Sequence, residues 1–412
     1  MRRFLRTLLA VSVTAVGATV PVGAAAAAAP GDNCAEPGQA IAPVPWQQQL
    51  LNPERIWPFA RGGGVTVAVL GSGVDAEHPQ LRNRVESGFD AVAGGGGANS
   101  DCLGVGTQVA GVIAARQATS VAFAGLAPDA TILPVRVLPD RQLGPAVVEP
   151  AVMTRAINAA VDRGADVIAV PVVSYSGSDA MRAAVERAVT KGVVVVAAAG
   201  DLGDVNGGNP VSYPAAYDGV IGVGAITRSG DRWMRSQYGN YVDLVAPGAD
   251  IVTLQRGRGQ TVAEGTGLAC GFVAGAVALA KAKRRDLDVA ELTRLLFATA
   301  SPTPAGPAYG HGIVDPYAAV NDQVSKASPT PLPALVRPAS EGTSAWARSR
   351  DFALVGALVA VLAVLVVLVV AIALPRGRRR LWRATIAAAP PHRAGPEEPG
   401  PPVLLFDDQP AG

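Results

Sequence analysis

Short, almost wholly apolar runs alternate with amphipathic stretches along most of the chain between residues 65 and 300. The amphipathic stretches have a helical period, and Gly164 and Gly192 close two of them. Strands that are apolar throughout and alternate with helices are typical of a parallel sheet covered on both faces, so the predicted fold class is α/β. The predicted helices are 107–115, 151–163, 179–191 and 290–298, and the predicted strands are 66–70, 131–137, 167–170, 193–198, 220–225 and 241–245.

A further helix is predicted directly after a tight glycine turn at Gly265. The stretch Gly265-Thr-Gly-Leu-Ala-Cys-Gly-Phe-Val-Ala-Gly275 runs on into residues 276–280, and nearly all of its residues are small and apolar. An apolar helix without a polar face is normally enclosed on all sides. We therefore expect a buried helix in this part of the chain.

The first residues of the chain have the pattern of a targeting signal. Three arginines lie within the first six residues, an apolar stretch covers residues 8–22, and small residues at 24–29 form a cleavage zone. This order is that of a secretory signal peptide, which we place at residues 1–29. A first membrane anchor is the alternative, but the apolar stretch is short and contains Gly, Thr and Ser.

Near the other end, residues 352–374 carry no charge and would span about 34 Å as a helix, which is enough to cross a membrane. Five arginines between residues 376 and 383 place the C-terminal side in the cytoplasm, although Arg348 and Arg350 weaken this bias. A buried core helix is the alternative, but the run has no polar face. We expect one transmembrane anchor and a disordered cytoplasmic tail at residues 375–412.

Two further segments flank the alternating region, which we define as a domain at residues 65–321. Residues 30–64 are rich in Pro and Gln with sparse apolar anchors, and we expect them to wrap around that domain. Residues 322–351 are rich in Pro, Ser and Ala and are predicted to form the stalk that leads to the membrane.

Charge and cysteine content limit the classes of function. With 35 Lys and Arg against 33 Asp and Glu, a net charge of +2 argues against nucleic acid as a partner. An exported domain with three cysteines favours one disulfide and one free thiol. We expect Cys34 to pair with Cys102, tying the extension to the domain, and Cys270 to be a small buried apolar group. No cluster of His and Cys has the spacing of metal ligands, and no cofactor is expected.

Four windows of the chain carry recognisable signatures. Residues 265–275 match much of Gly-Thr-Ser-x-Ala-x-Pro-x-Val-Ala-Gly, and residues 101–111 match much of Asp-x-x-x-His-Gly-Thr-x-Val-Ala-Gly. Residues 67–74 match a strand that ends in Asp-Thr/Ser-Gly, and residues 194–201 a strand that ends in Ala-Ala-Gly-Asn. In this order the windows resemble the subtilisin-like serine proteases, or subtilases, across residues 65–320. The resemblance implies the subtilisin-like three-layer fold with a mostly parallel central sheet.

The same resemblance shows which chemical groups the chain lacks. The position of the nucleophilic serine is Gly267, that of the aspartate is Gly71 and that of the histidine is Val105. The asparagine that helps to hold the oxyanion corresponds to Asp201. A triad needs a hydroxyl, an imidazole and a carboxylate, and a carboxylate at the oxyanion position repels the charge that develops there. The resemblance therefore implies an inactive homologue without catalytic residues.

Few other residues of the chain could take over the roles of the missing triad. Of the three histidines, His78 precedes a proline in a turn, His311 resembles part of a late structural turn, and His392 lies in the predicted tail. We expect structural roles for His78 and His311. Cys270 would need a base that the expected fold does not bring near it.

The overall plan is similar to that of the mycosins, the membrane-anchored subtilases of type VII secretion systems. The similarity rests on the exported domain, the short extension with a cysteine, the pair Asp101-Cys102, the stalk and the single anchor. Gly271 replaces the usual proline, and the second cysteine pair of mycosins is missing. The resemblance implies partners among the membrane components of a type VII secretion complex and a location in the cell membrane, with the N-terminal domain exported.

Several functions stay open at this point. The first is a non-proteolytic structural or assembly component of a type VII secretion system. The second is a decoy that binds peptides without cutting them, although Pro171 removes a backbone donor near the expected substrate strand. The third is a serine endopeptidase with unorthodox catalytic residues. Loss of function by drift is a further alternative.

Overall fold

The computed structural model describes residues 34–139, 147–205, 208–322 and 342–381. The chain divides into one compact unit that ends at Lys326 and a second that begins at Ala327. The expected signal peptide and cytoplasmic tail lie outside the described residues, apart from the part of the tail inside the last helix, and so does most of the expected stalk.

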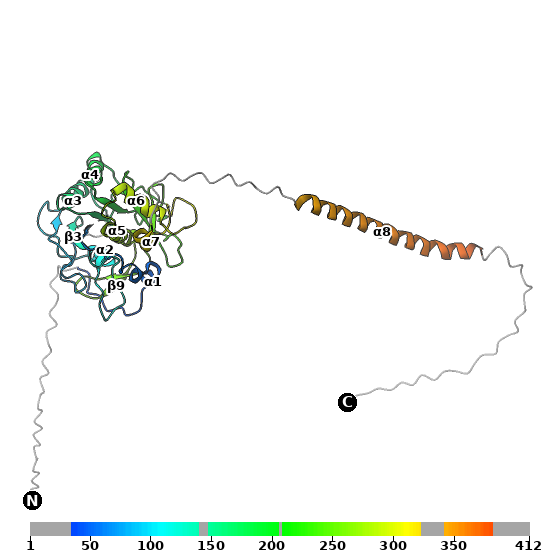
Figure 1. The fold of residues 1–412 in the computed structure, drawn as a ribbon, viewed down its shortest axis with the longest axis horizontal. Coiled ribbons are helices and arrows are strands. Elements are labelled where there is room, and N and C mark those ends of the chain that lie inside the picture. Colours follow the sequence, from blue (N-terminus) through cyan, green and yellow to red (C-terminus); the bar gives the residue numbers. More distant parts are fainter. Residues whose placement is uncertain (1–33, 140–146, 206–207, 323–341, 382–412) are drawn as a thin grey trace, which may run out of the picture. The chain divides into compact units, whose positions relative to one another are not determined.

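A seven-stranded parallel sheet forms the centre of the first unit (Figure 1). Its strand order is β2-β3-β1-β4-β5-β6-β7, so β4 lies in the middle and β1 beside it, paired with both β3 and β4. The predicted α/β class with a mostly parallel sheet is confirmed. The strands are β1 (Thr66–Gly71), β2 (Phe89–Asp90), β3 (Thr131–Arg136), β4 (Val167–Val170), β5 (Val194–Ala198), β6 (Val220–Ile226) and β7 (Leu244–Pro247).

Helices cover the two faces of this sheet, which explains why most residues of its strands are apolar. On one face, Val67 and Val69 of β1 pack in the cluster that holds α2 (Val105–Ala114) and α5 (Thr266–Lys283). On the other face, Ala68 and Leu70 pack with α3 (Pro150–Asp162) and α4 (Asp179–Thr190), which lie side by side at the top of Figure 1. Alternate residues of one strand thus serve two separate cores.

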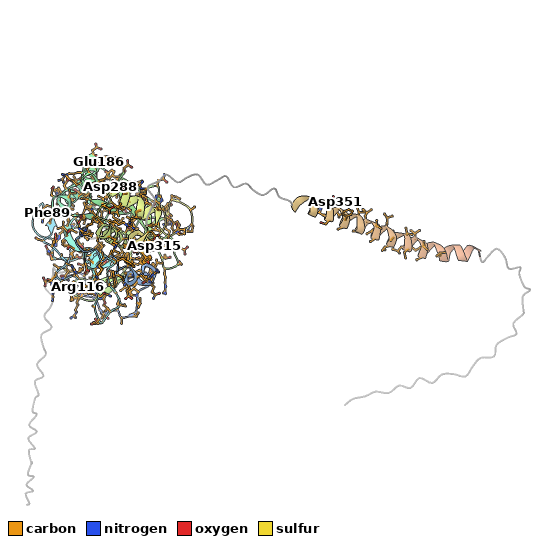
Figure 2. The ribbon with its side chains drawn as sticks, in the orientation of Figure 1. Phe89, Arg116, Glu186, Asp288, Asp315 and Asp351 are labelled. Carbon is orange, nitrogen blue, oxygen red and sulfur yellow. A yellow bond between two sulfur atoms is a disulfide. The ribbon has the colours of Figure 1, made fainter. Side chains whose placement is uncertain are left out.

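The last two helices of the unit begin at acidic caps. Asp288 accepts a hydrogen bond from the backbone N–H of Glu291 at the start of α6 (Val289–Ala298). Asp315 accepts one from Ala318 at the start of α7 (Pro316–Asn321). Both caps are labelled in Figure 2. Helix α5, predicted as a buried helix, has almost every side chain from Leu268 to Ala280 buried, in agreement with that prediction.

The N-terminal segment of residues 34–64, here called the arm, lies against residues 249–260, about 200 residues further along the chain. It contains α1 (Trp46–Leu51) and η1 (Pro53–Arg55). Gln39 exchanges two backbone hydrogen bonds with Gln260 in β9 (Gln260–Ala263), which pairs antiparallel with β8 (Ile251–Leu254). The indole of Trp46 donates to the carbonyl of Ala249 at 3.1 Å, and Gln47 donates to the carbonyl of Val252 at 2.8 Å. A disulfide joins Cys34 to Cys102, the pairing expected from the sequence.

Some elements differ from the prediction. The strand expected at 241–245 is β7 at Leu244–Pro247, and Asp243 lies just before it, where its carboxylate accepts a hydrogen bond from the backbone N–H of Gly222. The β8–β9 hairpin was not predicted, since β9 carries polar residues and no apolar run. The short helix α7, which follows α6, was not predicted either.

The second unit contains α8 (Gly342–Leu381). Its stretch Ser349–Ile372 has a mean hydropathy of 3.3 and none of it is buried, so it is long and apolar enough to cross a membrane. The expected anchor at residues 352–374 falls almost wholly within this stretch. Among the described residues, α5 also has the length and composition of a membrane span, but 78% of it is buried in the core of the first unit.

Candidate functional site

The four positions singled out from the sequence lie beyond two strands of the sheet and in the first turns of two helices. Gly71 ends β1, and Asp201 lies three residues after the end of β5. Val105 is the first residue of α2, and Gly267 is the second residue of α5. The carboxyl edge of a parallel sheet is where such folds build their sites.

The structure brings these positions together in two pairs. A Cβ atom at Gly71 would lie 3.2 Å from the Cα of Gly106, so the end of β1 meets the start of α2 directly. Asp201 lies against the first turn of α5 through Thr266, the neighbour of Gly267. The two helices pack against each other through their small residues.

A buried aspartate to which the sequence analysis gave no role in the site organises the first pair. Asp101 uses both carboxylate oxygens: one accepts from Ser72 and the backbone of Gly104, and the other from the backbone and hydroxyl of Thr107. Burial raises the pKa of Asp101, and these hydrogen bonds oppose the rise. The carboxylate thus holds the start of α2, and Val105 presents no titratable group there. In the sequence, the signal that could have pointed to Asp101 was its place as the first residue of the matched window 101–111.

Asp201 has a similar task at the start of α5. Its Oδ1 accepts from the backbone N–H of Thr266 at 2.8 Å and from the Thr266 hydroxyl at 2.6 Å. Burial raises the pKa of Asp201, while the Thr266 hydrogen bonds and the charge of Arg235 oppose the rise. The carboxylate therefore occupies the positive end of the helix, where an anion is favoured. A second anion that formed at this point would be repelled.

The position of the expected nucleophile has no room for a side chain. A Cβ atom at Gly267 would lie 2.6 Å from the carbonyl oxygen of Pro171 and 3.1 Å from its Cβ. Pro171 directly follows β4, which is buried throughout, so this carbonyl is held in place by the sheet. Contacts as short as 2.6 Å require the backbone to shift, so a serine does not fit in the present arrangement.

The segment beyond Pro171 is already paired through isolated bridges. The backbone N–H of Val148 donates to the carbonyl of Val173 at 2.8 Å, and Val147 forms a parallel bridge with Val173. The next residue, Ser174, exchanges two backbone hydrogen bonds of 2.8 Å with Tyr213. An extended peptide that adds to a sheet needs free backbone groups on an edge. This edge offers fewer of them because neighbouring segments use them.

The histidines and the free thiol occupy structural positions. His78 is buried and lies between the Gly259 carbonyl and the Gln80 backbone N–H, at 3.2 Å from each, and burial lowers its pKa. The ring of His311 stacks on Phe297 with centroids 4.3 Å apart. Burial raises the pKa of Cys270 to about 12, which makes it a poor nucleophile. His392 lies outside the described residues.

No group of three His, Cys, Asp or Glu side chains suitable for a metal ion occurs among the residues that the structure describes.

Replacing Asp201 by Asn is expected to raise the stability of the protein near neutral pH. Asn retains an oxygen for both Thr266 hydrogen bonds but carries no charge that burial penalises. The folded-state pKa of Asp201 lies above its ordinary value of 3.8. At pH values between the ordinary pKa and the folded-state pKa, the folded wild type therefore binds more protons than the unfolded chain. The gain from Asp201→Asn should therefore shrink as the pH falls through this window.

Urea unfolding of both proteins across pH 3.5–8 measures this difference. The same substitution at the exposed Asp286 controls for a charge change without burial. A difference between wild type and Asp201→Asn that does not change with pH would contradict the assignment.

Comparisons with known proteins agree with this architecture. Residues 62–325 match the model of the subtilase family, Peptidase S8. Subtilisin DY from Bacillus licheniformis is 32% identical over 277 residues, which cover 67% of this chain and 98% of that protein. The crystal structure of MycP1 from Mycobacterium smegmatis is similar with a TM-score of 0.63 and 28% identity, over 74% of this chain and 92% of that one. The MycP3 protease from the type VII (ESX-3) secretion system gives a TM-score of 0.61 and 28% identity, over 70% and 92%.

Proposed function

The chain belongs to the subtilase family, and from this membership we propose that it is a membrane-anchored member that does not cleave peptides and serves as a structural or assembly component of a type VII secretion complex. One observation carries the first half of this proposal. At the nucleophile position, Gly267 has no space for a side chain beside the Pro171 carbonyl.

The surrounding chemistry supports the same conclusion. Acyl transfer needs a base beside the nucleophile, but Val105 stands at the histidine position and Gly71 at the aspartate position. Stabilising an oxyanion needs unoccupied donors that point at it. Here the Thr266 backbone N–H and hydroxyl at the start of α5 both donate to the Asp201 carboxylate. At these positions the chain therefore offers no nucleophile, no base and, at Thr266, no free donor for an oxyanion.

The second half rests on the similar structures and on α8. MycP1 and MycP3 are described as parts of the ESX-1 and ESX-3 type VII secretion systems. Helix α8 would hold the chain in the membrane, with the arginines after residue 375 on the cytoplasmic side and the subtilase domain exported. A domain that keeps its fold and its anchor without a triad is suited to a role in assembly. The paired edge at Val173 favours this role over the binding of extended peptides.

The test is to delete the gene and measure the amount of intact secretion complex in gently solubilised membranes by native gel electrophoresis. We expect the amount to fall several-fold and to recover with the full-length chain. A chain that ends before α8 is the matched control and should not restore the complex. The tagged full-length protein should also migrate with the complex and cross-link to its membrane components. Migration as a lone monomer, with assembly and export unchanged by the deletion, would overturn the proposal.

A further inference from the structure

A pocket of about 410 Å³ lies between the arm and the loop that follows α2. Residues of α1 and η1 form its arm side, and residues 117–118 and 121–124 form its other side. Helix α2 separates it from the positions that correspond to the triad. Val105 begins this helix, whereas the loop at the pocket follows its last residue, Ala114, and the two ends are about 15 Å apart. The pocket therefore belongs to a different part of the domain.

Most of the polar side chains that line this pocket are uncharged carboxamides. They belong to Gln48, Gln49, Asn52 and Gln117. Among the residues that the structure describes, no hydrogen bond reaches the side chains of Gln48, Asn52 or Gln117. Gln49 uses only its nitrogen, which donates to the carbonyl of Val44 at 3.2 Å. Three carboxamides and the oxygen of a fourth are thus free to bind a ligand.

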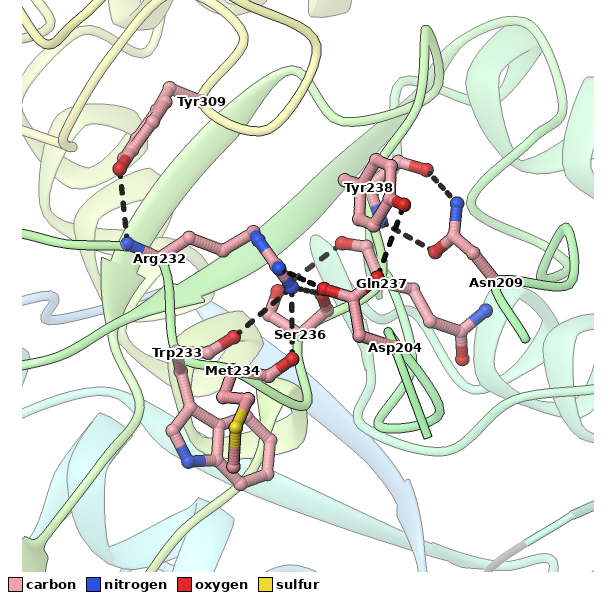
Figure 3. A network of polar contacts seen from close by, with 9 residues as sticks. All are labelled: Asp204, Asn209, Arg232, Trp233, Met234, Ser236, Gln237, Tyr238 and Tyr309. Carbon is pink, nitrogen blue, oxygen red and sulfur yellow. Dashed lines mark hydrogen bonds and ion pairs between the residues drawn. The ribbon is translucent and has the colours of Figure 1, made fainter. Parts of the chain in front are cut away.

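Carboxamides that hold the fold together are used more fully. In the polar network of Figure 3, Asn209 donates to the carbonyl of Tyr238 at 2.7 Å and accepts from its backbone N–H at 3.1 Å. The side-chain oxygen of Gln237 accepts from the Tyr175 hydroxyl at 2.9 Å and from the backbone N–H of Leu202 at 3.2 Å. The free carboxamides of the pocket have no such task in the fold, which leaves them available to a ligand.

Both walls of the pocket are held in place. On the loop side, the buried Gln80 donates from Nε2 to the carbonyl of Arg116 at 2.7 Å and to that of Phe123 at 3.1 Å, which fixes the loop at its two ends. On the arm side, the backbone N–H of Asn52 donates to the carbonyl of Gln48 at 2.9 Å and closes α1. A pocket with fixed walls binds a ligand with less loss of conformational entropy.

The buried part of the pocket lining is apolar. Pro53, Trp57 and Phe123 line the pocket and are buried. The indole N–H of Trp57 already donates to the carbonyl of Leu126 at 2.9 Å, so its ring offers the pocket only apolar surface. A matching ligand has an apolar face surrounded by several groups that donate and accept hydrogen bonds. A sugar ring is built in this way, with C–H groups on its face and hydroxyls around its edge.

We propose that this pocket binds a neutral sugar, one or two rings of a glycan, through the carboxamides of Gln48, Asn52 and Gln117. A hydroxyl and a carboxamide each donate and accept, so they pair in either direction. The volume of about 410 Å³ lies in the range of small-molecule sites, about 300–1,000 Å³. Glu54, the only charged residue that lines the pocket, repels an anionic ligand.

An extended peptide fits this pocket less well than a sugar. Such a peptide adds to the edge of a strand, but α1, η1 and a loop line the pocket. The exported location proposed above would give the domain access to glycans outside the membrane. The preference of the pocket for a sugar does not rest on that location.

The test is calorimetry of the full-length protein, in a detergent without a sugar headgroup, with the neutral disaccharide N,N′-diacetylchitobiose. We expect binding to the wild type and about tenfold weaker binding to the double variant Gln48→Leu, Gln117→Leu, which lacks two hydrogen-bonding side chains. Gln39→Leu is the matched control, because Gln39 is an exposed glutamine of the arm that does not line this pocket. It should bind the disaccharide as the wild type does.

The single variant Gln117→Ala keeps the test decisive if the double variant is unstable. Gln117 is exposed in a loop, so its loss should leave the fold intact and weaken binding several-fold. No binding of the disaccharide, or equal binding by the wild type and the pocket variants, would overturn the proposal. So would tighter binding of N-acetyl-trialanine methylamide, which would assign the pocket to a polypeptide. The native-gel test of the deletion strain decides the assembly role separately.

Discussion

No hydrolysis of peptides is expected from a variant that restores the four groups of the family by Gly71→Asp, Val105→His, Asp201→Asn and Gly267→Ser. The reason is steric, because a Cβ atom at position 267 would lie 2.6 Å from the Pro171 carbonyl oxygen. A displaced nucleophile contributes little, and loss of the nucleophile alone costs a subtilisin about 10⁶ in turnover. We expect the restored variant to stay at the background rate of a fluorogenic peptide substrate and to resist a fluorophosphonate probe.

The single change Gly267→Ser tests the steric reason directly. Overpacking of this kind costs about 1–3 kcal/mol in the free energy of unfolding, which urea titration measures. Gly95→Ser is the matched control, since nothing lies within 4 Å of a Cβ at that position, and its effect should stay within about 0.5 kcal/mol. Covalent labelling of the substituted residue in the restored variant, with wild-type stability, would show that the site can still be assembled.

Removing the disulfide is expected to cost more than any other change to the arm. Cys34 and Cys102 are 68 residues apart, and releasing a loop of this length lowers the free energy of unfolding by about 4 kcal/mol in the chain-entropy model. The measurement is urea unfolding of the double variant Cys34→Ser, Cys102→Ser. Limited proteolysis should then cut within residues 34–64, where the arm is no longer tied at its first described residue.

Reduction provides the control for this prediction. Dithiothreitol should lower the stability of the wild type and of a Cys270→Ala variant by the same amount, because Cys270 is a buried free thiol. It should leave the double variant unchanged. A double variant as stable as the wild type would mean that the non-covalent contacts of the arm are sufficient.

The strands and helices of the domain could be predicted because each buries a complete apolar run or stripe. The positions of Gly71, Val105, Gly267 and Asp201 could be found as well, because local signatures surround them. The β8–β9 hairpin could not be predicted, since its polar residue Gln260 is buried by pairing with the arm. That partner lies more than 200 residues away in the sequence. Periodicity within a short window does not report such a contact.

The chemistry around these positions also depends on contacts between distant segments. Only the fold shows that the Pro171 carbonyl occupies the space beside Gly267, about 100 residues further along the chain. Likewise, the sequence suggests repulsion of an oxyanion by Asp201, but not that this carboxylate caps α5 through Thr266. The network of Asp101 with Ser72 and Thr107 was missed for the same reason.

The long-range contacts of the arm mean that it can dock only after later parts of the chain are present. Trp46 and Gln47 find their hydrogen-bond partners 203 and 205 residues later in the sequence, and Ile41 finds Gln260 after 219 residues. A chain made from its N-terminus must therefore complete β8 and β9 before the arm can dock, and contacts of such long range form slowly. During this interval the arm remains available to proteases and chaperones. Its docking therefore cannot precede synthesis of the last strand of the hairpin.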